Sequence, residues 1–428
     1  MTASVTHQTI EAVWRIESAR LIGGLTRIVR DIGLAEDLAQ DALVVALERW
    51  PESGVPDNPG AWLMATAKYL AIDTVRRRDR LERKHEQIAR EIGMQLAMDG
   101  SDLDAELDDR IGDDVLSLMF MCCHPVLSAD ARIALTLRLI GGLTTTEIAR
   151  AFLVPEPTVA QRMVRAKRTL TAAEVPFEVP SGDELDRRLA SVLEVVYLVF
   201  NEGYTATAGE DWMRPALCEE ALRLGRILAA LAPGEAEVHG LLALMELQAA
   251  RSPARVDAGG EPVLLLEQDR ERWDQLQLRR GLEALALAQR GAANPGPYLL
   301  QAAIAACHGR ARSAAQTDWR EIAALYDALV VRLPTPVVAL NRAVAHTMAF
   351  GPAAGLELVD ALRAEPALAR YHLLPSVRGE LLAKLGRGAE ARAELERAAE
   401  LTDNRRERET LLRRAAACTG DPRTVSGS

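Results

Sequence analysis

The sequence predicts an all-α protein, and three observations support this fold class. Alanine, leucine, arginine and glutamate dominate the 428 residues, whereas aromatic residues make up only 4%. Apolar residues recur three and four positions apart, as on one face of a helix, and runs of β-branched residues are scarce. Short segments rich in proline and glycine separate these patterns and are expected to end the helices. The length is sufficient for two to four domains.

Composition and charge divide the chain into four parts. We expect a compact helical domain over residues 1–90, a linker over 91–114, a helix-turn-helix domain over 115–175 and an all-helical body over 176–428. The linker contains nine acidic residues and one basic residue, which is typical of a flexible tether. The segment Pro176–Pro180 marks the last boundary.

The helix-turn-helix prediction rests on residues 137–168. Thr144 and Glu147 form a capping box, which starts a helix over Thr145–Phe152. Pro155 and Pro157 then end that helix and begin a second one. The second helix has one apolar stripe of Val159, Met163, Ala166 and Leu170, and its opposite face is basic. Such a pair fits the major groove of DNA, although an αα-hairpin with a solvated basic face would give the same pattern.

Three amphipathic helices are expected in the N-terminal domain. They cover Glu11–Arg30, Ala35–Trp50 and Ala61–Arg78, with Pro51–Gly60 as a loop because its residues favour turns. Among the apolar residues, Ile16 is expected in the core, and Leu47 is expected to face inward. The basic run after the third helix is either a solvated helix end or, beside the aromatic Trp62 and Tyr69, a surface for unstacked bases.

Two motifs together resemble a known family. Residues 35–50 and 59–78 resemble region two of extracytoplasmic-function (ECF) sigma factors, and residues 141–168 are similar to region four of the same family. Their order, with a linker between them, implies a bacterial RNA polymerase specificity subunit. The stand-alone alternative is a helix-turn-helix transcriptional regulator with a repeat-type sensor domain, which would bind duplex DNA tightly without polymerase.

The resemblance implies roles for particular residues. Those expected to dock on core RNA polymerase are Asp37, Gln40 and Asp41, unless they simply form a solvated helix face. Those expected at the minus-ten element of promoter DNA are Asn58, Trp62, Ala65, Lys68, Tyr69, Arg76, Arg77 and Arg78. The family often has a basic residue at position 65 and an asparagine at position 69. Those expected at the minus-thirty-five element are Thr158, Gln161, Arg162, Arg165, Lys167 and Arg168.

Helical patterns continue through the C-terminal body. They cover Leu185–Phe200, Met213–Ala232, Glu235–Ala250, Asp269–Arg290 and Tyr298–Arg310, with a small hairpin expected within residues 251–266. Two helix pairs, over residues 336–362 and 375–401, are offset by roughly 36 residues, which is typical of tetratricopeptide-like repeats that stack into a solenoid. An ordinary helical bundle is the alternative. A subgroup of ECF sigma factors carries such an extension, and residues 197–204 resemble it. We expect this body to regulate the promoter-binding modules in cis, in response to a small molecule or a protein.

Several classes of protein and site are not expected. The net charge of −10 argues against indiscriminate coating of nucleic acid, and five cysteines do not make a disulfide framework, so a cytoplasmic protein is indicated. No apolar run is long enough to span a membrane. We expect no metal site at Cys122, Cys123 and His124, no cofactor and no enzymatic activity, because no catalytic motif is present. Polar residues including Asn201, Glu202, Arg255, Asp257, Asp318 and Trp319 are expected to cap helices rather than bind a ligand.

Overall fold

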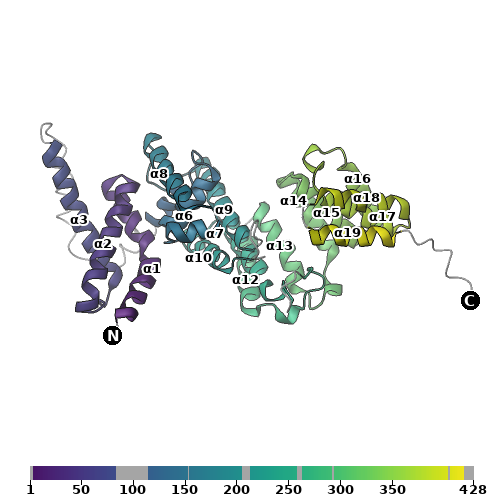
Figure 1. Cartoon of the computed structure of the whole chain (residues 1–428), viewed down its shortest axis with the longest axis horizontal. Helices are drawn as coiled ribbons and strands as arrows, with labels where there is room; N and C mark the ends of the chain where they lie inside the picture. The colour runs from purple at the N-terminus through teal and green to yellow at the C-terminus, as the bar shows by residue number, and fades with distance from the viewer. Residues whose placement is uncertain are drawn as a thin grey trace, which may run out of the picture. The chain divides into compact units, whose positions relative to one another are not determined.

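The protein is a chain of helices in two compact units. The computed structural model describes residues 3–82, 114–152, 154–204, 213–257, 263–291, 294–402 and 405–418. Within these segments every regular element is a helix (Figure 1), which confirms the all-α prediction. The first unit covers Met1–Pro233 and the second Gly234–Ser428. No helix of the described residues is both long and apolar enough to cross a membrane.

Three long helices form the N-terminal part of the first unit. They are α1 (Ala3–Val29), α2 (Ile32–Ser53) and α3 (Pro59–Glu82). Asp31 starts α2, because its side chain accepts a hydrogen bond from the Leu34 N–H at 2.8 Å. Two core predictions were wrong: Ile16 is 65% exposed and Leu47 is 36% exposed. The buried stripe of α1 runs instead through Leu21 and Leu25, on the side of the helix away from Ile16.

The predicted loop over Pro51–Gly60 is shorter than expected. Helix α2 continues through Pro51 to Ser53, and α3 begins at Pro59. Trp50 is only 1% exposed, and its burial anchors the last turn of α2, in which Pro51 lacks a backbone N–H to donate. Gly54 then ends α2 with a positive φ of 86° and donates its N–H to the Trp50 carbonyl at 3.0 Å.

Four helices form the next part of the first unit. They are residues 114–122, α6 (Ala129–Leu139), α7 (Thr145–Ala151) and α8 (Glu156–Ala172). Asp114 was expected to end the linker, but it lies in the first of these helices and pairs with Arg27 at 3.2 Å. The rest of the acidic linker, residues 91–113, lies outside the described residues.

Two helices of the predicted C-terminal body belong to the first unit. These are α9 (Asp183–Tyr204) and α10 (Pro215–Leu231), and the division between the units falls after Pro233. Helix α9 packs against α6 and α10. The extension after residue 176 is therefore shared between the two units.

The second unit consists of helices that pack on their neighbours in sequence. Its α-helices are α11 (Ala236–Ala249), α12 (Gln275–Gly291), α13 (Pro297–Arg310), α14 (Trp319–Arg332), α15 (Pro336–Phe350), α16 (Pro352–Ala361), α17 (Leu373–Lys384), α18 (Gly388–Leu401) and α19 (Arg405–Ala417). Its short 3₁₀ helices are Ser252–Ala254, Arg270–Arg272, Ala314–Gln316 and Pro366–Leu368. The pairs α15–α16 and α17–α18 match the two predicted helix pairs, and they share one apolar cluster that includes Leu340, Val359 and Leu382.

One local prediction in the second unit was inaccurate, and another lies partly outside the described residues. The helix expected over Asp269–Arg290 is interrupted, because Asp274 accepts hydrogen bonds from the Leu276 and Gln277 N–H groups and starts α12 there. The middle of the hairpin expected within residues 251–266, residues 258–262, lies outside the described residues, so the hairpin stays a prediction. A 3₁₀ turn is followed by a single hydrogen bond from the Val263 N–H to the Arg255 carbonyl at 2.7 Å.

Candidate nucleic-acid interface

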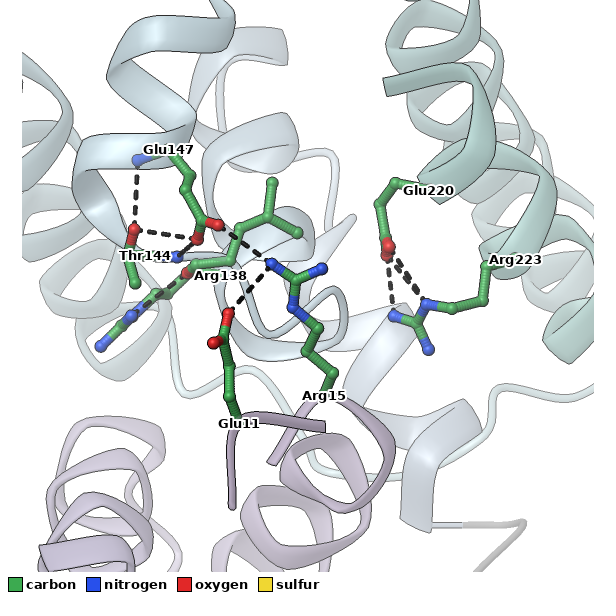
Figure 2. A network of polar contacts seen from close by, with 8 residues as sticks. Glu11, Arg15, Arg138, Thr144, Glu147, Glu220 and Arg223 are labelled. Carbon is green, nitrogen blue, oxygen red and sulfur yellow. Dashed lines mark hydrogen bonds and ion pairs between the residues drawn. The ribbon is translucent and has the colours of Figure 1, made fainter. Parts of the chain in front are cut away.

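The first helix of the predicted helix-turn-helix begins with a complete capping box. The Thr144 hydroxyl accepts the Glu147 N–H at 3.1 Å, and the Glu147 carboxylate accepts the Thr144 N–H at 2.7 Å (Figure 2). Burial by itself would raise the pKa of Glu147, but the hydrogen bonds from Thr144 and the Arg15 guanidinium lower it below its ordinary value. The start of α7 is therefore fixed by hydrogen bonds between residues three positions apart.

Helix α8 presents three of its six predicted DNA-binding residues on an exposed face. Its apolar stripe of Val159, Met163, Ala166 and Leu170 is buried against α6 and α7. On the other face, Gln161, Arg165 and Arg168 are exposed, and their spacing of four and three residues places them in one row along the helix. This row, beside the exposed Val164, is open to a partner.

Two further predicted residues of α8 have protein partners. Arg162 pairs with Asp130 of α6 at 3.0 Å, and Lys167 pairs with Glu36 of α2. Thr158 is partly buried near the start of the helix. Of the six predicted minus-thirty-five residues, three therefore form an exposed row, two form ion pairs with other helices and one is partly buried.

The predicted polymerase-docking residues form the outer face of α2. Asp37 and Asp41 are exposed, whereas Gln40 is partly buried and donates a hydrogen bond to Glu36 at 2.8 Å. Desolvation raises the pKa of Asp37, with contributions from neighbouring carboxylates, although Lys167 acts in the opposite direction. The influence of Lys167 indicates that this end of the acidic face lies near α8.

Glu36 connects the two modules, and sequence reasoning did not single it out. Its side chain is 7% exposed, yet its carboxylate accepts a hydrogen bond from Arg138 at 2.8 Å and one from Lys167. Burial would raise the pKa of Glu36, but these two cations outweigh that effect and lower it. The only signal in the sequence is a third acidic position beside Asp37, which looks like another solvated residue.

A second set of contacts joins α1 to the turn before α7. Arg15 reaches Glu147 at 3.1 Å and Glu11 at 3.5 Å (Figure 2). Gly142 has a positive φ of 69°, and a Cβ atom there would lie 3.1 Å from the Ser18 hydroxyl. The N-terminal helices and the helix-turn-helix thus pack together in the described first unit.

Helix α3 supplies the predicted minus-ten residues, but not all in the expected way. Tyr69 is 74% exposed, which excludes a core position, and Ala65 is exposed four residues earlier. Trp62 is partly buried and packs edge-to-face on Trp50 at 5.3 Å between ring centroids. Asn58 caps the helix, because its side-chain oxygen accepts the Ala61 N–H at 3.1 Å.

The basic end of α3 is only partly described. Arg76, Arg77 and Arg78 continue the helix, but their side chains lie outside the described part of the chain, and Lys68 is partly buried.

Several of the remaining candidate residues lie in the core or have protein partners. Cys122 and Cys123 are buried core residues, and the described residues contain no cluster suited to a metal ion. Asp318 caps α14 by accepting the Glu321 N–H at 2.9 Å, and Glu202 pairs with Arg214. Trp319 is partly buried and packs edge-to-face on His308 at 5.3 Å between ring centroids.

Comparison with known proteins matches three segments to family models. Residues 16–81 match sigma-70 region 2, residues 117–170 match sigma-70 region 4, and residues 188–289 match a family of unknown function, DUF6596. An uncharacterised protein of Rhizobium meliloti, R00370, is 42% identical over 95% of both chains. A probable ECF RNA polymerase sigma factor of Mycobacterium tuberculosis, SigI, is 29% identical over 40% of this chain and 58% of its own length.

The first unit contains two helical modules that carry the predicted contact residues on exposed faces. The matches to both sigma-70 regions fall on these modules, in the order that the sequence predicts. The chain belongs to the ECF class of RNA polymerase sigma factors and carries a C-terminal extension. It directs transcription initiation, and the matched sigma regions belong to families that are not enzymes.

Proposed function

We propose that the outer face of α2 docks on core RNA polymerase through Asp37, Gln40 and Asp41. The two exposed carboxylates suit a basic partner surface. Gln40 acts indirectly, because its amide holds the carboxylate of Glu36. Charge complementarity of this kind sets the register and the rate of association more than the affinity.

The exposed row of α8 reads the minus-thirty-five element. Arg165 can donate two hydrogen bonds to guanine and Gln161 can pair with adenine, which discriminates against a wrong base by about 1–3 kcal/mol. Arg168 then holds a phosphate, which positions the helix without reading sequence. Arg162 joins the base-reading residues once it leaves Asp130, 3.0 Å away.

The exposed face of α3 captures an unstacked base of the minus-ten element. Tyr69, at 74% exposure, is available for stacking without any rearrangement of the core. Stacking of a base on an aromatic side chain contributes about 1–3 kcal/mol, and this offsets part of the cost of opening the duplex. Trp62 is held in place on α3 by its ring contact with the buried Trp50.

Glu36 keeps the isolated sigma factor in a closed arrangement. A DNA phosphate competes with the Glu36 carboxylate for the charge of Lys167, so promoter binding weakens the contact between α2 and α8. Docking of α2 on polymerase loosens this contact and releases Lys167. The isolated chain then binds promoter DNA poorly, and the polymerase complex binds it well.

The C-terminal helices regulate these modules in cis, in answer to a small molecule or a protein. The proposal is supported by the length of the extension and by the position of α9 and α10 in the same unit as the promoter-binding helices. The protein acts in the cytoplasm, where core RNA polymerase and promoter DNA are its partners.

Transcription in vitro with purified core polymerase tests this function. The full chain should direct initiation at specific start sites. Asp41→Arg should slow and weaken association with the core enzyme, and Arg165→Ala should preserve association but weaken promoter selection. Glu283→Arg, at an exposed position of α12 in the second unit, is the control for Asp41→Arg. Failure of the wild-type chain to bind core polymerase would refute the proposal.

A further inference from the structure

The first helices of the extension bond to the ends of the region-four helices. The last carbonyl groups of a helix have no partner within the helix and need another donor. At the end of the helix over residues 114–122, the His124 N–H bonds to Met121 rather than to Phe120. The Phe120 carbonyl instead accepts a hydrogen bond from Arg188 of α9 at 2.8 Å. Arg188 is 5% exposed, and its guanidinium lies 6.0 Å from the centre of the Phe120 ring.

Helix α6 ends in the same way. The Ile140 carbonyl accepts a hydrogen bond from Arg223 of α10 at 2.8 Å. Glu220, one turn before Arg223, orients the guanidinium with contacts of 2.7–3.2 Å (Figure 2). A Cβ atom at Gly141 would lie 2.9 Å from the Glu220 carboxylate, so a glycine after the end of α6 allows α10 to approach.

Helix α7 completes the pattern. The carbonyl of its last residue, Ala151, accepts a hydrogen bond from Arg214 at the start of α10, and Glu202 of α9 holds Arg214 at 2.5 Å. The Ser191 hydroxyl of α9 also donates to the Cys123 carbonyl at 2.6 Å. In the reverse direction, Arg132 of α6 pairs with Glu194 of α9 at 2.8 Å.

We infer that α9 and α10 are part of the region-four module and cap the C-terminal ends of its helices. A cation at the C-terminus of a helix satisfies its carbonyls and its dipole together, and here three arginines serve three different helices. Among the described contacts, the exposed row of α8 is left open. Because α9 and α10 span the start of the segment that matches the family of unknown function, the first part of that family folds onto the helix-turn-helix and holds its scaffold rigid. The consequence for promoter reading rests on the function proposed for α8.

Hydrogen exchange in the full-length protein tests this inference without DNA or polymerase. Arg188→Met and Arg223→Met each remove one cap while keeping an unbranched side chain of comparable length. The amides of the last turn of the capped helix should exchange about 10- to 100-fold faster, which corresponds to the loss of one hydrogen bond to a charged group. In the polymerase complex, the same variants should weaken binding to the minus-thirty-five element.

Arg187→Met is the matched control. Arg187 precedes Arg188 but is exposed and bonds to the Asp183 carbonyl of its own helix. Arg223→Met decides the matter if Arg188→Met fails to fold, because the Arg223 side chain is 34% exposed. Unchanged exchange in Arg223→Met at the end of α6 would overturn the inference. Altered exchange with unchanged promoter binding would retain the capping role and refute only the function proposed for α8.

Discussion

Replacement of Glu36 by glutamine should open the first unit. The substitution keeps the size of the side chain but removes a carboxylate that is 7% exposed and held by two cations. Glutamine offers one acceptor oxygen, so one of the two cations then faces an NH2 donor. Loss of one partner of a buried ion pair costs about 3–5 kcal/mol. The Arg138 and Lys167 side chains are 18% and 23% exposed, so water compensates in part, and we expect about 2–3 kcal/mol.

This loss should appear in two measurements. The midpoint of thermal unfolding should fall by about 4–10 °C for a unit of this size. Association with promoter DNA should increase, because Lys167 is released for a phosphate. Glu48→Gln, an exposed position on the same helix, should change neither quantity. A Glu36→Gln variant with wild-type stability and wild-type affinity for DNA would refute the reasoning.

The same contact predicts a dependence on pH. The pKa of Glu36 is lowered in the folded protein from 4.5, so the unfolded chain binds this proton more readily. The stabilisation by Glu36 is therefore complete above its unfolded pKa and is lost as the pH falls through the lower folded value. The difference in stability between the wild type and Glu36→Gln should shrink over this acidic range, as equilibrium unfolding at a series of pH values would show.

Three further predictions concern single positions. Tyr69→Ala should weaken open-complex formation by about 1–3 kcal/mol, and the unfolding midpoint should stay the same because the side chain is 74% exposed. Permanganate footprinting measures the opening, and equal opening by the variant and the wild type would contradict the prediction. Arg165→Ala should reduce discrimination at one base pair by about 1–3 kcal/mol, measured by competition between promoter variants, whereas a uniform loss across sequences would indicate a phosphate contact. Thr144→Ala should destabilise the first unit by about 1 kcal/mol through loss of the capping box. The comparison is Thr169→Ala, inside α8, where the hydroxyl bonds only to the Arg165 carbonyl of its own helix; chemical denaturation that shows the same midpoint for both variants would disprove the prediction.

The sequence by itself determined the elements whose causes are local. The capping box of Thr144 and Glu147, the buried stripe of α8 and the helix pairs of the second unit all depend on residues a few positions apart. The resemblance to both sigma-70 regions was likewise readable from short motifs. These features follow from helical periodicity and from hydrogen bonds between near neighbours, which a linear pattern records.

Only the tertiary structure decided which residues join distant parts of the chain. Glu36 meets Lys167 across 131 positions, and Arg188 and Arg214 cap helices 68 and 63 residues away. In the sequence these residues look like ordinary charged positions on amphipathic helices. Their roles depend on which side of the helix is buried by packing. Because each residue is rotated by about 100° from the last, an error of one or two positions in the buried stripe places a residue such as Ile16 on the wrong side.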